Sequence, residues 1–189
     1  MGILIHLSWT MKDTNNILEG TKVTLRALEP SDINYLYEWE NDSDSWFVSN
    51  TLTPYSKYIL QKYIENSHLD IYQTRQLRLM IICKETNLPI GTIDLFDFDP
   101  FHNRAGVGIL IAKKEMQQKG FASEAMEILI NYSFNHLNLH QLYCNITTNN
   151  TKSISLFKKY NFKISGEKKQ WLKYGETWVD EYFLQLIHA

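Results

Sequence analysis

The sequence is poor in the features that mark disulfide-linked, nucleic-acid-binding and membrane-spanning proteins. Its 189 residues include only two cysteines and carry a net charge of −2. No metal-ligand spacing surrounds Cys83 or Cys144, so we expect buried reduced thiols, no metal and a cytoplasmic location. The small charge gives no electrostatic reason to bind nucleic acid. No apolar run approaches the roughly 20 residues of a membrane span, so no membrane association is expected.

What the chain does contain is typical of one globular domain. Hydrophobic residues make up 44% and charged residues 21% of the sequence, and this length suits one domain better than two. The first residues have no basic region and no small-residue cleavage site, so they make a poor signal peptide. We expect residues 1–20 to be peripheral, with either Met1 or Met11 as the start, and residues 21–189 to form a single domain.

Hydrophobic periodicity predicts an alternation of strands and helices. A strand at 22–28 leads into two helices that begin near Pro30 and Pro54, with an irregular polar stretch at 42–53 between them. An amphipathic helix is the clearest element, at 120–137, and a short helix follows at 150–161. The remaining strands are expected at 77–83, 90–98, 105–111, 141–147, 162–164, 170–173 and 178–187.

The most informative segment is the turn at 117–122, QQKGFA, just before the amphipathic helix. Gly120 lets the backbone approach a ligand closely, and the small Ala122 keeps that approach open. The N–H groups and the dipole of a helix N-terminus favour a phosphate. Taken alone, however, such a hexapeptide is more often an ordinary connection between a strand and a helix.

A second polar cluster follows one strand and one helix later. Asn150 and Ser153 lie three residues apart at a predicted helix start. Simple capping explains this pair, because Asn and Ser are preferred at helix caps. The functional interpretation is a set of polar contacts to a pantetheine or nucleotide arm. Lys159, considered alone, is better explained as a solvated surface charge.

The element order and the two motifs, Q-x-x-G-x-A and N-x-x-S-I-x-L-F-x-K-x-N-F, together resemble the GNAT family of acetyl-CoA-dependent N-acetyltransferases. The resemblance covers roughly residues 20–188. Within the family, the stretches at 90–97, 103–105 and 138–143 are similar to the branch of spermidine N-acetyltransferases and ribosomal-protein-alanine acetyltransferases. The resemblance implies an α+β, three-layer GNAT fold, with a mixed, mostly antiparallel sheet of about six or seven strands and about four helices.

The resemblance also implies an acyltransferase. It would move an acetyl group from acetyl-CoA to a primary amine, either a small or polyamine-like molecule or a protein N-terminus, by direct attack in a ternary complex. A strand would pair with the pantetheine, and the turn at 117–122 would hold the pyrophosphate. This branch often self-associates, so a homo-oligomer is expected. The implied coenzyme-binding residues are Ile109, Leu110, Ile111, Gln117, Gln118, Lys119, Gly120, Phe121, Ala122, Ser123, Asn150, Ser153, Phe157 and Lys159.

The proton route departs from the family pattern. Phe157 stands where many relatives carry a Tyr that protonates the leaving thiolate. Tyr160 and Tyr174 are candidate replacement acids, and a thiolate can also leave unprotonated. An amine with a pKa near 10 must lose a proton, at a cost of roughly 4 kcal/mol at neutral pH. Asp94 is the favoured acceptor of that proton, while Asp97 should point to the opposite face unless a bulge intervenes.

Phe157 and a second departure, at Gly106, leave the activity and the acceptor open. Phe157 motivates a second hypothesis, a catalytically degenerate GNAT domain that binds CoA as a sensor or binding module. Gly106 stands where spermidine-type relatives carry Glu, so a polyamine acceptor is not established. The aromatic residues expected to shape part of the acceptor cleft are Trp46, Phe47, Tyr55, Tyr58, Tyr63 and Tyr72.

Overall fold

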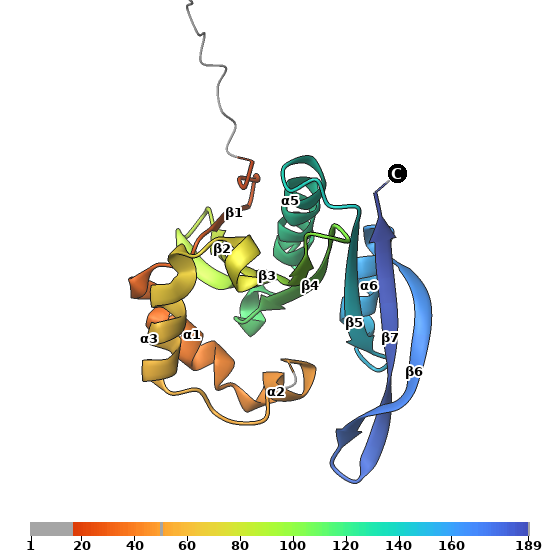
Figure 1. The fold of residues 1–189 in the computed structure, drawn as a ribbon. Coiled ribbons are helices and arrows are strands. Elements are labelled where there is room, and N and C mark those ends of the chain that lie inside the picture. Colours follow the sequence, from red (N-terminus) through yellow and green to blue (C-terminus); the bar gives the residue numbers. More distant parts are fainter. Residues whose placement is uncertain (1–16, 50, 189) are drawn as a thin grey trace, which may run out of the picture.

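A computed structural model describes residues 17–49 and 51–188, which form a mixed sheet with helices on both faces (Figure 1). The strands run in the order β1-β2-β3-β4-β5-β7-β6, and among the strand pairs of these residues only β4 and β5 are parallel. The seven strands are β1 (Val23–Arg26), β2 (Leu77–Cys83), β3 (Leu88–Asp99), β4 (Arg104–Ile111), β5 (Gln141–Thr147), β6 (Lys163–Tyr174) and β7 (Thr177–Ile187). The α-helices are α1 (Ile33–Glu40), α2 (Ser43–Ser49), α3 (Lys57–Glu65), α4 (Ile71–Thr74), α5 (Phe121–Asn135) and α6 (Thr151–Lys159).

Two hydrophobic clusters divide the core between the faces of the sheet. Ile81 and Ile93 lie in the cluster that α5 and α6 cover, together with Met126 of α5. Met80 lies in the cluster beneath α1 and α3, together with Leu36. Neighbouring strand residues such as Met80 and Ile81 point to opposite faces. The nearly continuous apolar strand β2 therefore contributes side chains to both clusters. The predicted three-layer architecture and mostly antiparallel sheet are confirmed.

The parallel pair β4–β5 separates soon after it begins. Pairing joins only Arg104–Gly106 to residues 141–143. Beyond this point β3 accompanies β4 as far as Ile111, and β7 accompanies β5 as far as Thr147. The carboxyl halves of β4 and β5 therefore border a gap in the sheet, the position at which α/β sheets commonly bind ligands.

Three local expectations were wrong. About four helices were expected, whereas the described residues form six. Helix α2 occupies a segment expected to be irregular. Helix α4 is a single turn that the Asp70 side chain caps by accepting from Tyr72 N and Gln73 N. β6 is one long strand instead of two short ones, because register shifts near Gly166 and between residues 168 and 172 interrupt its alternation.

The segment before β1 is tied to the domain. Leu18 packs against the core and its carbonyl accepts from Leu25 N at 2.8 Å. Glu19 forms a β-bridge with Thr24 and an ion pair with Lys84. The predicted peripheral segment at 1–20 thus includes residues that contact the sheet. Residues 1–16, and with them the alternative starts, lie outside the described residues.

Candidate functional site

The edge of β4 that borders the gap carries backbone groups suited to an extended ligand. Ala112 N donates to Ile90 O at 2.9 Å, so alternate pairs along β3–β4 are hydrogen-bonded, and the N–H and C=O of Ile109 and Ile111 point away from β3. Gln117 Nε2 confirms this direction by donating to Ile111 O at 3.0 Å. The backbone of Leu110 instead bonds to β3. Of the three strand residues predicted to bind the pantetheine, Ile109 and Ile111 have the required orientation.

The turn at 117–122 has the conformation its glycine suggested. Gln118 has φ 60° and Gly120 has φ 89°, both in the left-handed region. Gly120 is the N-cap of α5 and has no side chain to cap the helix. The first N–H groups of α5 have no intrahelical partner, so they are available to an anion.

Lys22, the residue directly before β1, lies over the same turn. Lys22 Nζ donates to Lys119 O at 3.2 Å, and it lies 3.3 Å from where a Cβ on Gly120 would be. The Glu124 carboxylate of α5 holds the backbone at the start of β1 in place. It accepts from Thr21 N, Lys22 N and Val23 N at 2.9, 2.7 and 2.7 Å. A side chain at position 120 would be both strained and crowded.

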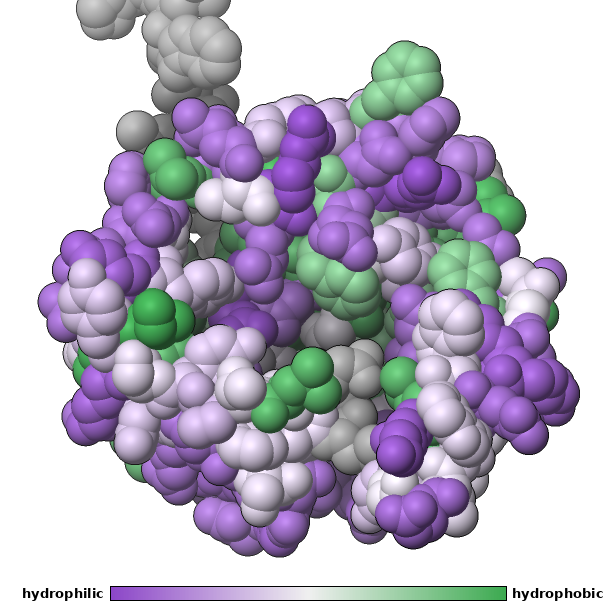
Figure 2. Space-filling model, turned by 60° about the horizontal axis from the view of Figure 1, so that its bottom comes forward, coloured by the Kyte–Doolittle hydropathy of each residue, from purple (hydrophilic) through white to green (hydrophobic). Residues whose placement is uncertain are grey.

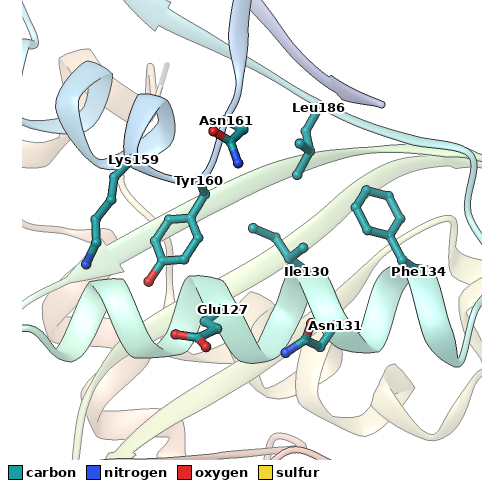
Figure 3. A pocket seen from close by; sticks show the side chains of 8 residues that line it. All are labelled: Glu127, Ile130, Asn131, Phe134, Lys159, Tyr160, Asn161 and Leu186. Carbon is teal, nitrogen blue, oxygen red and sulfur yellow. The ribbon is translucent and has the colours of Figure 1, made fainter. Parts of the chain in front are cut away.

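The end of α6 is fastened to the first turn of α5. Lys159 Nζ donates to Ser123 Oγ. The Tyr160 hydroxyl lies 2.8 Å from Ser123 Oγ and donates to the Ser123 carbonyl. Figure 3 shows the Tyr160 hydroxyl directed at α5, with the Lys159 side chain beside it. Lys159, predicted to bind the coenzyme, and Tyr160, a candidate proton donor, therefore both contact the first turn of α5, where a phosphate was predicted to bind.

A groove continues from this point between α5 and α6, with a volume of about 390 Å³. Figure 3 shows the α5 wall as side chains from successive turns of the helix, with Ile130 and Phe134 directed toward Leu186 of β7. Its lining residues are Glu127, Ile130, Asn131, Phe134, Lys159, Tyr160, Asn161 and Leu186.

The other residues of the second motif support the helix itself. Asn150 Oδ1 accepts from Ser153 N at 3.1 Å, which is the capping interpretation of this pair. Asn150 follows the carboxyl end of β5, so the pair also lies at the rim of the gap. Phe157 is buried and packs edge-on against Phe162, with ring centroids 4.9 Å apart.

An ion cluster lies on the opposite face of the sheet, beneath α1. Arg78 Nε donates to Asp94 Oδ1 at 2.6 Å, and Arg78 Nη1 donates to Glu40 Oε1 at 2.5 Å. Burial raises the pKa of the Asp94 carboxyl, and the nearby guanidinium offsets part of that rise. Burial likewise raises the pKa of the adjacent Tyr63 to about 12, so this phenol stays protonated at neutral pH. Asp94 is thus an ion-paired carboxylate with an elevated proton affinity.

Asp94 lies beside the gap. Its Oδ2, 3.5 Å from Arg78 Nη2, lies 3.8 Å from where a Cβ on Gly108 would be. Gly108 belongs to the half of β4 that has left β5. The bulge that the sequence left open is present, because the register shifts between Phe96 and Asp99 and Asp97 adopts φ 48°.

Sequence reasoning missed Glu40, Arg78 and Lys22. Arg78 had a signal, because it is the one charge within the apolar strand LRLMIIC, and buried charges are rarely unpaired. Of the aromatic residues expected at the cleft, Tyr63 lies beside Arg78, with the guanidinium carbon 5.5 Å from its ring centre. Tyr55, Tyr58 and Tyr72 are exposed, and the Phe47 side chain lies outside the described ones.

Comparison with known proteins places these features in a family. Residues 22–163 match the family described as acetyltransferase (GNAT) domain. The chain is 30% identical over 150 residues to the spermidine N(1)-acetyltransferase of Vibrio cholerae, covering 78% of this chain and 82% of that one. Its fold is similar to a spermidine N-acetyltransferase from Vibrio cholerae in complex with CoA and spermine, with TM-score 0.78 and 24% identity over 89% of this chain and 96% of the other. It is also similar to the dodecameric form of that enzyme in an intermediate state, with TM-score 0.74 and 26% identity over 89% and 95%.

None of the helices formed by the described residues is long and apolar enough to cross a membrane. Within the same part of the chain, no group of three or more His, Cys, Asp or Glu side chains is placed to hold a metal ion.

Proposed function

The chain belongs to the GNAT acetyltransferase family, as the sequence motifs predicted, and we propose that it moves an acetyl group from acetyl-CoA to a primary amine. The observation that carries this proposal is the gap between β4 and β5. The start of α5, with the Lys159 ammonium group on it, lies on one side of the sheet, and Asp94 lies on the other. A donor bound through that gap would present its reactive end to the carboxylate side. The family relatives are named N-acetyltransferases, which agrees with an acyltransferase.

The residues at the gap fit the chemistry of acetyl-CoA. Pantetheine contains amide groups, which the outward N–H and C=O of Ile109 and Ile111 can pair with as a neighbouring strand would. The first amides of α5 and the ammonium groups of Lys22 and Lys159 suit a pyrophosphate. The groove beside Tyr160 lies beyond that point and offers space for the adenosine end.

The proposed transfer is a direct attack of the amine nitrogen on the thioester carbonyl. The C–N bond forms, the C–S bond breaks, the thiolate leaves, and the second proton of the nitrogen passes to that thiolate or to water. Asp94 accepts the proton that the ammonium must lose, directly or through water, because its raised pKa brings its proton affinity closer to neutral pH. A backbone N–H of β4, such as that of Ile109, polarises the carbonyl. No described side chain is required as a covalent intermediate.

The leaving thiolate needs no proton from Phe157, which has none to give. The Tyr160 hydroxyl is engaged by Ser123 at the coenzyme turn, so this position favours a binding role over the predicted proton-donor role. A thiol pKa near 8.5 makes the free thiolate a tolerable leaving group. The buried Phe157 also favours the second candidate, a degenerate domain that binds CoA without turnover.

We also propose a cytoplasmic location and self-association for this chain. Cys83 and Cys144 are buried and not joined in a disulfide, which suits the reducing cytoplasm. The dodecameric relative supports self-association of this chain.

Coenzyme binding and initial-rate kinetics test the proposal together. Calorimetry should show CoA binding to the wild type and its loss in Gly120→Glu, because that side chain enters a left-handed N-cap and adds a charge of the same sign as the phosphates. Varying acetyl-CoA and amine together should give intersecting reciprocal plots, as a ternary complex requires. Parallel plots would contradict direct attack, and CoA binding with no turnover of any amine would favour the degenerate domain.

A further inference from the structure

The face of the sheet that carries Asp94 is only partly covered by helices. The strand residues that α1 and α3 cover on this face come from β2 and the end of β4, and include Met80, Ile82 and Leu110. Figure 2, which brings the lower end of Figure 1 forward, shows a hollow near the centre of this side of the molecule, with both hydrophilic and hydrophobic groups around it. An acceptor approaching the gap from the Asp94 side must cross this face.

Beside the gap, the part of β4 that faces this approach is glycine backbone without side chains. Gly106 and Gly108 occupy successive positions of β4 on the Asp94 face, opposite Phe96 and Asp94 in the β3 register. A Cβ on Gly106 would lie 2.3 Å from the Phe96 ring, so that ring lies directly over bare backbone. The floor beside the gap is therefore a flat aromatic surface, and no carboxylate can stand at position 106 without displacing it.

The aromatic surface extends across the sheet. The Phe96 and Tyr143 rings meet edge to face, 6.1 Å apart, and Tyr143 lies 5.5 Å from Phe183 of β7. The Tyr143 hydroxyl lies 3.5 Å from Asp97 Oδ2. Three rings from three strands thus form one wall, which begins beside Asp94 and the gap.

The charges facing this approach suit a single ammonium group. At the gap, one guanidinium on Arg78 stands between two carboxylates, Glu40 and Asp94, leaving one excess negative charge. Farther along the same face, Glu181 is buried and neutralised by Lys168 at 2.8 Å. Another carboxylate of β3, Asp97, is exposed and lies 3.5 Å from the Tyr143 hydroxyl, three residues beyond Asp94. A linear polyamine would place its second charge against rings instead of against a carboxylate.

We infer that the acceptor is a monoamine with an aromatic or similarly flat apolar group, its ammonium at the Glu40–Arg78–Asp94 cluster and its ring on Phe96 and Tyr143. This inference rests on the proposed acetyl transfer and narrows its acceptor class. It predicts that an arylalkylamine is a better acceptor than an aliphatic amine of similar reach or a polyamine.

The test measures thiol release from acetyl-CoA with 2-phenylethylamine, n-butylamine and spermidine. The wild type should show kcat/KM for 2-phenylethylamine about 10-fold above the other two, the advantage expected of an aromatic pair in a partly desolvated site. Phe96→Leu keeps an apolar side chain but removes the ring, and should erase most of that advantage while changing n-butylamine less than about 3-fold. Phe101→Leu, which changes an exposed phenylalanine in the β3–β4 turn, is the matched control and should behave as wild type.

The outcomes separate this inference from the function on which it rests. A preference for spermidine over both monoamines, or equal kcat/KM for 2-phenylethylamine and n-butylamine, would overturn the monoamine assignment and leave acetyl transfer standing. Thiol release with none of the three amines would overturn the monoamine assignment, and acetyl transfer itself would be overturned only if a peptide with a free N-terminus also released no thiol. The wild-type panel needs no variant, so folding of Phe96→Leu does not decide the result.

Discussion

Lys159 offers a sharp test of the coenzyme turn. Its ammonium group is exposed at the end of α6 yet is held on Ser123 Oγ in the first turn of α5. Replacement by Gln removes the charge and keeps most of the side-chain length. A charge-assisted hydrogen bond contributes about 1.5–3 kcal/mol. Taking about 2 kcal/mol for this exposed site, and 1.4 kcal/mol per tenfold, the Kd for CoA should rise about 25-fold.

The neighbouring Lys158 supplies the control. Lys158 is also exposed but lies one position earlier in α6. Lys158→Gln therefore makes the same chemical change on a different side of the helix. Calorimetry at low and moderate salt should show that wild-type affinity falls with salt and that Lys159→Gln has the shallower dependence. If Lys159→Gln weakens CoA binding less than about 3-fold, or if both variants weaken it equally, the Lys159 ammonium does not bind the pyrophosphate.

Three other variants test the supports of the site. Glu124→Gln should lower the free energy of unfolding in urea by about 3 kcal/mol, because one of its two oxygens no longer accepts from the backbone at 21–23. Burial raises the Glu124 pKa, but these bonds outweigh it and hold the pKa below the ordinary value. The carboxylate therefore stabilises the fold above the unfolded pKa, and this stability is lost as pH falls through the folded pKa. The variant should lack that part of the acid decline, and an unchanged decline would contradict the assignment. Asp94→Asn should lower kcat/KM about 100-fold with CoA affinity unchanged. In the wild type kcat/KM should rise with pH as Asp94 loses its proton, above the usual carboxyl range because burial raises its pKa. The variant should lack this rise. An unaltered pH profile would exclude Asp94 as the base. Asp32→Asn should cost about 2 kcal/mol of unfolding free energy in thermal or urea melts, because it weakens the two bonds from Arg26 at 2.7 and 2.8 Å. No loss would mean that this buried carboxylate is not a structural anchor.

Periodicity predicted the elements whose burial is one-sided. The apolar stripe of α5 and the strand Gln141–Thr147 were predicted closely because each presents one face to the core. The two register shifts in β6 interrupt such a pattern. The α2 sequence SDSWFVS is short and groups its apolar residues consecutively, so it shows no helical spacing. Local signals therefore identified most of the sheet and missed its irregular edge.

The coenzyme side of the site was predictable and the acceptor side was not. Gly120 and the first turn of α5 are local in sequence, and their chemistry follows from the geometry of a helix start. The Glu40–Arg78–Asp94 cluster joins a helix to two strands across up to 54 residues, which no local pattern reveals. The position of the Phe96 ring over Gly106 likewise depends on the pairing of β3 with β4.

The most direct test of acetyl transfer is the stoichiometry of turnover. Purified protein is incubated with acetyl-CoA and an amine, while free thiol is measured by colorimetry and acetylated amine by mass spectrometry. Acetyl transfer in a ternary complex predicts one acetylated amine for each thiol released, with no acetyl group on the protein. Saturable CoA binding without thiol release from any amine, or thiol release without acetylated amine, would contradict it.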